Sequence, residues 1–305
     1  MKKFLAAVLA AVLCMSVLAG CGSKAEDALP TEGVSEENAG ASEGAAPAEN
    51  ATEDNGDSKE AAPVEDAGAT EAAAVSEALA DGVLNVGTNA EFPPFEYVND
   101  NGEPDGFDIA LIKAIGEKMG VEVQVDNMEF ASLVSSIGTK IDVSIAGMTV
   151  TEERLNTVDF SNSYYEAVQF VIVPEGSSIA SAEDLKGKTI GVQLGTTGDF
   201  IADEIEDASV SQYNKAVDAV NDLVNGRLDC VIIDKNPALV FQSKFDGKVT
   251  AIDGAQFDFE VENYAIAIPK GDAALAEQIN NALQELIDDG TFDALVAEYI
   301  EGGNE

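Results

Sequence analysis

The stretch KIDVSIAGMT (Lys140–Thr149) and its later counterpart RLDCVIIDKN (Arg227–Asn236) carry the fold prediction. Each opens with a basic residue, an apolar residue and an aspartate, continues as an apolar run and ends in polar residues. A second pair, LNVGTNAEF (84–92) and TIGVQLGTTGDF (189–200), repeats a short β-branched run that opens into a Gly- and Thr-containing loop. Because the pairs follow in the same order in both halves, although at different spacings, the sequence suggests two units built on one plan.

Amphipathic helices are predicted between these strands. The segment GFDIALIKAIGEKMG (106–120) places Ile109, Ile112, Ile115 and Met119 on one face, and FASLVSSIGTK (130–140) does the same with Phe130, Leu133, Val134 and Ile137. Strands that alternate with helices of this length indicate parallel α/β sheets. The predicted fold is therefore α/β with two doubly wound lobes, and in such sheets ligands bind at the carboxyl ends of the strands.

The N-terminus has the pattern of an export signal. MKKF supplies a positive start, and LAAVLAAVLCMSVLA (5–19) is an apolar run too short to span a membrane comfortably. The run closes on LAGC (18–21), which resembles the bacterial lipobox, where cleavage before the cysteine leaves a lipid-bearing N-terminus. The alternative is an ordinary signal peptide that contains a cysteine. We predict a signal peptide over 1–20, lipidation of Cys21 and a place on the extracytoplasmic face of the cell membrane.

The segment after Cys21 is predicted to be a disordered acidic tether over 21–80. It is rich in Ala, Glu, Gly and Ser and has no aromatic residue, so it cannot bury enough apolar surface to offset the entropy of ordering. The whole chain has a formal net charge of −41, which argues against nucleic acid as a partner. Cys14 leaves with the signal peptide and Cys230 is then alone, so we expect no disulfide within the mature fold.

Arg154 is one of the two arginines in the chain, and it follows the strand that ends before Gly147. Arg227 precedes its strand, so we expect it at the opposite end of the sheet. Gly147 lets the backbone approach a ligand, and Thr149 offers a hydroxyl and begins a capping-box pattern with Glu152. A guanidinium beside free backbone N–H groups suits a carboxylate. The alternative role for Arg154 is a surface salt bridge, with Glu152, Glu153 or Asp159 as partner.

Asp234 occupies the equivalent place after the second-lobe strand. There it either faces the cleft and pairs with an ammonium group, or it caps the helix that begins near Asn236 and Pro237. An anion site on one lobe and a cation site on the other fit a zwitterion such as an α-amino acid.

Further candidate residues surround these two positions. Phe92 and Phe130 are candidate walls for a small ligand, with plain core residues as the alternative. The loop from Gly195 to Gly198, with Thr196 and Thr197, has the pattern of an anion-binding helix start. Four polar residues are candidates for contacts with the ligand side chain: Asn89, Glu91, Gln193 and Glu262.

From about Gly82 to Tyr299 the sequence resembles the polar amino-acid-binding proteins of bacterial ABC importers, solute-binding protein family 3. The matching strings, in order, are GTNAEFPPFEY, GFDIALIKAI, IDVSIAGMTVTEER, VDFSNSYY, DLKGKTIGVQLGTTG and LDCVIID. The resemblance implies a type II periplasmic-binding-protein fold, with a two-strand hinge near 167–173 and 262–268. It further implies lobe 1 at 81–170 and 265–305, and lobe 2 at 171–264.

The resemblance also assigns roles to the candidate residues. Arg154, helped by Thr149 and Thr197, takes the α-carboxylate, Asp234 takes the α-ammonium, and Phe92 and Phe130 enclose the side chain. Binders of cationic side chains in this family often have Asp where Asn89 stands, so the usual countercharge is missing here. Glu91 or Glu262 is the expected replacement, and the acidic surroundings lead us to expect a polar ligand with a lean toward basic ones.

The expected function is an amino-acid-binding receptor that closes around its ligand and delivers it to an ABC permease with a cytoplasmic ATPase. We expect a monomer without cofactor or metal, and not an enzyme, because the chain has no His. The alternative is a secreted cyclohexadienyl (prephenate or arogenate) dehydratase on the same fold, with Glu91 or Glu262 as the general acid.

Overall fold

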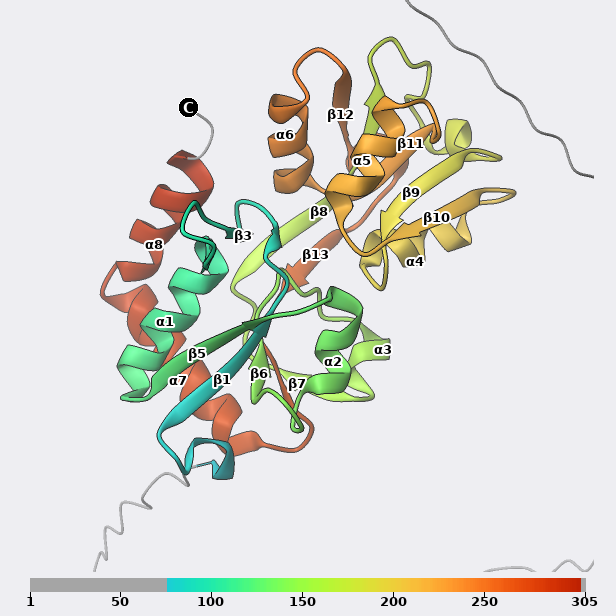
Figure 1. Cartoon of the computed structure of the whole chain (residues 1–305). Coiled ribbons are helices and arrows are strands. Elements are labelled where there is room, and N and C mark those ends of the chain that lie inside the picture. The colour runs from blue at the N-terminus through green and yellow to red at the C-terminus, as the bar shows by residue number, and fades with distance from the viewer. Residues whose placement is uncertain (1–75, 303–305) are drawn as a thin grey trace, which may run out of the picture. The chain divides into compact units, whose positions relative to one another are not determined.

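Two mixed β-sheets with helices around them form the part of the chain that the computed structural model describes, residues 76–302 (Figure 1). The first sheet has the order β5–β1–β6–β14–β7, formed by Glu122–Asn127, Val83–Thr88, Val143–Ser144, Ala267–Pro269 and Val158–Phe160. The second has the order β10–β9–β11–β8–β12, formed by Ser209–Tyr213, Thr189–Gln193, Cys230–Asp234, Tyr165–Pro174 and Val249–Asp253. A strand outside this path, β13 (Val261–Tyr264), pairs with β8.

Helices cover both sheets. Around the first sheet lie α1 (Phe107–Met119), α2 (Leu133–Ser136), α3 (Glu152–Leu155), α7 (Ala273–Asp288) and α8 (Thr291–Leu295). Around the second lie α4 (Thr197–Glu204), α5 (Ala216–Val224) and α6 (Lys235–Lys244). Short 3-10 turns occur at Glu77–Leu79, Phe130–Ser132, Ala182–Leu185 and Gly254–Phe257, and a π-helical turn at Val296–Glu301. A small sheet, β2–β3–β4, is formed by Glu91–Phe92, Glu96–Val98 and Pro104–Asp105.

The α/β prediction is confirmed, but the sheets are mixed rather than parallel. Strand β1 is parallel to both β5 and β6, and β9 is parallel to both β10 and β11. Strand β14 is antiparallel to β6 and β7, and β8 is antiparallel to β11 and β12. Strand β8 carries the chain into the second sheet, and β14 follows β13 (Val261–Tyr264) back into the first, so each enters a sheet against the direction of the βα units already there.

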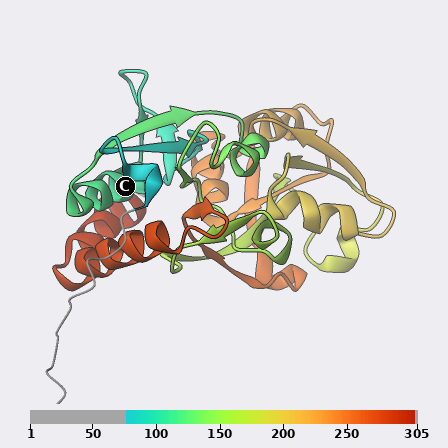
Figure 2. The same cartoon turned by 90° about the horizontal axis from the view of Figure 1, so that it is seen from below.

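The two lobes, one around each sheet, are joined by β8 and β13 (Figure 1). Residues 165–168 of β8 pair with β13, whereas residues 169–174 pair with strands of the second sheet. In Figure 2, the early elements and the C-terminal helices lie together at one end and the elements of the second lobe at the other. The predicted lobe boundaries, 170/171 and 264/265, fall on or directly after these crossing strands.

The repeated aspartates play the same structural part in both lobes. The Asp142 carboxylate accepts the backbone N–H of Asn85 at 2.8 Å, and the Asp229 carboxylate accepts that of Thr189 at 2.8 Å. Each aspartate therefore ties the start of one strand to its parallel neighbour. This shared hydrogen bond explains why an aspartate recurs at the same place in the loose sequence repeat.

The two helices expected from the sequence agree with the structure to different degrees. Helix α1 agrees closely, with Ile109, Ile112 and Ile115 buried. The helix expected over 130–140 is a 3-10 turn followed by α2, which ends at Ser136. Ile137 is already extended and forms a bridge with Ile141, so the chain turns into β6 sooner than the periodicity suggests.

The folded part begins before the predicted end of the tether. Residues 77–79 form a 3-10 turn capped by Ser76, whose hydroxyl donates to Asp272 at 2.5 Å, and Leu79 is buried. The assignment of 76–80 to a disordered tether is therefore wrong, because Leu79 and Ser76 have partners in the fold. The signal peptide, Cys21 and the rest of the tether lie outside the described residues. Across 76–302, no helix is both long and apolar enough to span a membrane.

Candidate functional site

A pocket lies where the strands of both sheets present their carboxyl ends. The pocket volume that protein atoms do not fill is about 300 Å³, and part of it is open to solvent. Its lining consists of Asn89, Phe92, Phe130, Ala146, Gly147, Thr149, Arg154, Gln193, Thr196, Thr197 and Asp234. Ten of the twelve predicted site residues are in this lining, Ala146 is added to them, and Glu91 and Glu262 lie outside it.

The Arg154 guanidinium is buried at the lobe interface. It donates to the carbonyl of Thr149 at 2.6 Å in its own lobe and to the carbonyl of Gly195 at 2.9 Å in the other. Its centre lies 5.5 Å from the centroid of the Phe130 ring, a cation–π distance. Burial lowers the pKa of Arg154, opposed by nearby carboxylates, but a guanidinium remains charged in proteins.

The surface salt bridge considered for Arg154 does not form. Within the described residues no ion pair includes Arg154, and Asp159 pairs instead with Lys270. Arg154 is 7% exposed, because α3 holds it against the pocket rather than on the surface.

The start of α3 also differs from the prediction. The N-cap is Thr151, whose hydroxyl oxygen accepts the backbone N–H of Arg154 at 3.2 Å, and not Thr149. Thr149 remains extended because it forms an isolated bridge with Tyr264, and its hydroxyl donates to Glu262 at 2.5 Å. Arg154 is thus the third residue of a four-residue helix.

Asp234 is the last residue of β11 and is 6% exposed. Although it stands at the N-cap position of α6, its side chain makes no capping hydrogen bond, so the capping alternative is wrong. Its carboxylate instead accepts the Tyr264 hydroxyl at 2.6 Å. Burial, followed by the negative charge of Glu262, raises the pKa of Asp234 to about 7.

Arg154 and Asp234 are both buried beside the same pocket, and in the described part of the chain neither makes an ion pair. Proteins rarely bury a charge without an ionic or polar partner, because desolvation is expensive. The pocket therefore presents one cationic and one anionic wall to whatever occupies it.

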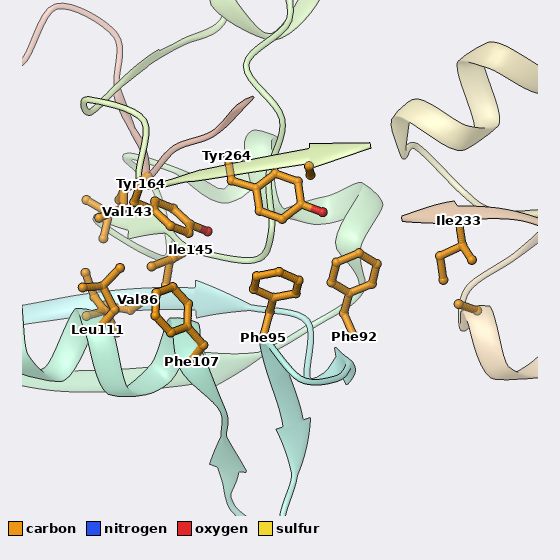
Figure 3. Close-up of a cluster of buried hydrophobic side chains, with 14 of the residues drawn as sticks. Val86, Phe92, Phe95, Phe107, Leu111, Val143, Ile145, Tyr164, Ile233 and Tyr264 are labelled. Atoms are coloured by element: carbon orange, nitrogen blue, oxygen red, sulfur yellow. The ribbon is translucent and has the colours of Figure 1, made fainter. Parts of the chain in front are cut away.

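Aromatic side chains form the apolar part of the lining. Phe92 stacks on Phe95 at 5.9 Å between ring centroids, and Phe95 meets the edge of Tyr264 at 5.3 Å. Figure 3 shows Phe92 and Phe95 side by side, with Tyr264 above them. Phe92 thus belongs to the core cluster and also lines the pocket, so the two alternatives considered for it are compatible.

Gly147 supplies a close backbone approach. Its φ is +54°, and a Cβ atom at this position would lie 2.9 Å from the Phe92 ring. A side chain here would therefore be strained and would enter the aromatic wall.

The second-lobe loop opens α4 at the pocket. Thr196 caps the helix by accepting the backbone N–H of Asp199 at 3.3 Å, and Asp199 accepts the N–H of Gly195 at 2.8 Å. The N-terminus of α4 therefore faces the pocket through Thr196 and Thr197. Across the lobes, the Gln193 amide donates to the Asn89 side-chain oxygen at 2.8 Å.

The two remaining candidates have other partners. Glu262 accepts hydrogen bonds from the hydroxyls of Thr149 and Thr197, at 2.5 Å and 2.8 Å. Glu91 forms an ion pair with Lys215 of the second lobe. Both carboxylates lie near the pocket without lining it.

Sequence reasoning missed residues that support the site. Tyr264 donates to the Asp234 carboxylate at 2.6 Å, and Gln169 donates to the Thr197 hydroxyl at 3.0 Å. Both lie on the crossing strands, where the sequence shows only apolar runs with isolated polar residues. No local pattern indicates which of those residues contact the side chains that line the pocket.

Comparison with known proteins gives consistent results. Residues 84–302 match the family described as bacterial extracellular solute-binding proteins, family 3. The probable histidine-binding protein of Neisseria gonorrhoeae is 31% identical over 72% of this chain and 85% of its own length. The arginine-binding extracellular protein of Bacillus subtilis (strain 168) is 36% identical, over 72% of this chain and 86% of its own.

Solved structures give the same result for the fold. An ancestral arginine-binding protein bound to arginine has a TM-score of 0.68 and 40% identity, covering 72% of this chain and 98% of its own. The two lobes and their crossing strands are thus a type II periplasmic-binding-protein fold. The chain belongs to the bacterial extracellular solute-binding proteins of family 3.

Proposed function

We propose that the pocket binds a free polar α-amino acid as a zwitterion, with its carboxylate at Arg154 and its ammonium at Asp234. The observation that carries this proposal is the pair of buried, opposite and ionically unpaired charges from different lobes. Only two donors of the Arg154 guanidinium have partners in the described residues, both of them carbonyls, so donors remain for a carboxylate. The N-terminus of α4 adds further donors for the anion, and Thr149 and Thr197 add theirs when their hydroxyls turn from Glu262 to the ligand.

The side chain of the ligand would lie between Phe92 and Phe130 and meet the amides of Asn89 and Gln193. The lining contains no carboxylate besides Asp234, so a neutral polar side chain needs no rearrangement. A cationic side chain requires a countercharge, and Glu91 supplies it only by exchanging Lys215 for the ligand. The Lys215–Glu91 pair is partly exposed, and pairs of this kind contribute only about 0 to 1 kcal/mol. The expected preference for a basic ligand therefore depends on this exchange.

A thermal-shift screen of the twenty amino acids, followed by calorimetry, tests the proposal. A ligand that binds only the folded state raises its melting temperature. We expect a shift with one or a few polar amino acids. If arginine binds, the Lys215→Ala variant should bind it more tightly and bind glutamine unchanged. Absence of any shift, on protein freed of carried-over ligand, would contradict the proposed function.

Binding and closure are coupled in this proposal. Arg154 already reaches Gly195, and Gln193 reaches Asn89, so the lobes meet through a few polar contacts around the pocket. A ligand that contacts both lobes favours the closed arrangement by its differential affinity. The closed receptor would then dock on a permease driven by a cytoplasmic ATPase, acting as a monomer.

A dehydratase that acts on prephenate or arogenate receives no support from the comparisons, and the carboxylates that would act as its general acid lie outside the pocket lining. Glu262 is hydrogen-bonded to two threonines and Glu91 pairs with Lys215. We therefore propose that the protein is not an enzyme. Turnover of prephenate or arogenate by the purified protein would contradict this.

We also propose that the mature protein is anchored to the cell membrane by lipid on Cys21, after removal of residues 1–20. The support is the LAGC pattern that ends the apolar run. Fractionation of cells that express the Cys21→Ala variant should find the protein released from the membrane fraction. Equal membrane association of this variant and the wild type would contradict lipid anchoring.

A further inference from the structure

Two carboxyl groups, Glu96 and Asp108, lie together in the core of the first lobe. Glu96 is on β3 and Asp108 is in the first turn of α1, and both are 0% exposed. Their carboxyl groups are within hydrogen-bonding reach of each other. None of the ion pairs within 76–302 includes either residue. Two buried acids therefore face each other without a cation.

The hydrogen bonds around the pair are unequal. One oxygen of Asp108 accepts the backbone N–H of Gly147 at 2.7 Å and the hydroxyl of Tyr164 at 2.8 Å. The other Asp108 oxygen and both oxygens of Glu96 accept no hydrogen bond from an N–H or O–H donor among the described residues. Buried carboxylate oxygens without donors are strongly unfavourable.

One proton removes this difficulty. If Glu96 carries it, the Glu96 hydroxyl donates to the free oxygen of Asp108, and the two groups no longer repel each other. Asp108 is the better anion, because it has two donors and lies in the first turn of a 13-residue helix, where the helix dipole favours negative charge. Burial raises the pKa of Glu96 well above its usual value, and that of Asp108 to about 6.

The titratable groups that face the pair favour the same assignment. Tyr164 precedes β8 and donates to Asp108, and Asp234 of β11 adds a negative charge that disfavours ionisation of Glu96.

We propose that Glu96 is held in its protonated form, donates its carboxyl hydrogen to Asp108, and so positions the Asp108 carboxylate against the peptide N–H of Gly147 at the ligand pocket. Glu96 and Asp108 are positioning residues, since neither lines the pocket. The pair connects β3, α1, the Gly147 loop that leads to Thr149 and Arg154, and the residue before the crossing strand β8. The protonation state depends only on the fold, whereas its effect on ligand binding rests on the proposed function.

Infrared spectroscopy of the purified protein tests the protonation directly. At about pH 9 ordinary carboxyl groups are ionised. We expect the wild type to retain a carbonyl band of a protonated carboxyl group and Glu96→Gln to lose it. Asp234→Asn serves as the control, because Asp234 also has a raised pKa, and this variant should keep the band. A wild type without the band, or a band that survives Glu96→Gln, would overturn the proposal.

Conservative replacement tests the positioning role. Glu96→Gln keeps an N–H donor for Asp108, so ligand affinity should stay within about threefold of wild type. Glu96→Met keeps the side-chain length without a donor and should weaken binding by about tenfold or more. Equal losses in the two variants would overturn the role.

The two tests separate the two claims. If Glu96→Met fails to fold, the infrared comparison of the wild type with Glu96→Gln still decides the protonation. If no amino acid binds the wild type, the proposed function fails while the infrared result stands by itself.

Discussion

Arg154 and Arg227 are the chain's two arginines, and they differ in every respect that matters for binding. Arg154 is buried at the pocket, whereas the Arg227 side chain is 64% exposed and pairs with Asp222. We expect Arg154→Ala to weaken amino-acid binding by about 2 to 5 kcal/mol, because it leaves a ligand carboxylate buried and unpaired. Arg227→Ala is the matched control and should bind like the wild type. Calorimetry that finds Arg154→Ala within about threefold of wild type would remove Arg154 from the site.

Asp234 makes the binding pH-dependent. Its pKa in the protein without ligand is raised to about 7, by burial and then by Glu262, and an ammonium ligand requires the ionised form. Binding below this pH therefore releases a proton, so affinity should fall as the pH drops below about 7, by up to tenfold per unit. Titrations between about pH 5 and pH 8 measure the slope, and Asp234→Asn should abolish it. An affinity that is constant over this range would contradict the role of Asp234.

The sequence was informative about which residues meet at the pocket and less so about their partners. Strand ends followed by Gly, Thr, Arg or Asp place side chains at a sheet edge, which is why ten of the predicted residues line one pocket. Glu91 lies outside the pocket lining because it pairs with Lys215, and Glu262 because it is hydrogen-bonded to two threonines. These partners are far from the glutamates in the sequence. Such long-range partners leave no local pattern.

At the scale of elements, Arg154 is positioned by α3, which is a very short helix. The helix has four residues. Its N-cap is Thr151, whose hydroxyl oxygen lies 3.2 Å from the backbone nitrogen of Arg154. Thr151→Ala should lower the free energy of unfolding by about 1 kcal/mol, whereas Thr151→Ser retains the cap and the stability. Urea unfolding of the two variants measures the difference. Equal stability of both would show that the cap contributes nothing.

Helix boundaries show what local patterns miss. The Thr149–Glu152 spacing fits a capping box, but Thr149 is bridged to Tyr264, so the N-cap lies two residues later, at Thr151. The apolar period through Ile137 fits a longer α2, but the Ile137–Ile141 bridge ends it. In both cases a β-bridge overrides a correct local signal.

At the scale of the whole molecule, the crossing strands decide what the sequence could not. The repeated βα pattern predicts two doubly wound lobes, and they form. The antiparallel entry of β14 and β8 follows from the return of the chain across the hinge, which no single segment encodes. The crossing strands β13 and β8 carry Tyr264 and Gln169, which hydrogen-bond to the pocket residues Asp234 and Thr197, so the hinge and the support of the site come from one pair of elements.

The central claim is that one zwitterion bridges the buried charges of the two lobes. The most direct measurement is a calorimetric comparison of the best amino-acid ligand with its α-carboxamide and its α-deamino analogue on the wild-type protein. Each analogue leaves one of Arg154 and Asp234 without a charged partner, so each should lose at least about 2 kcal/mol, roughly 30-fold in affinity. Binding of either analogue within about threefold of the parent would contradict the claim.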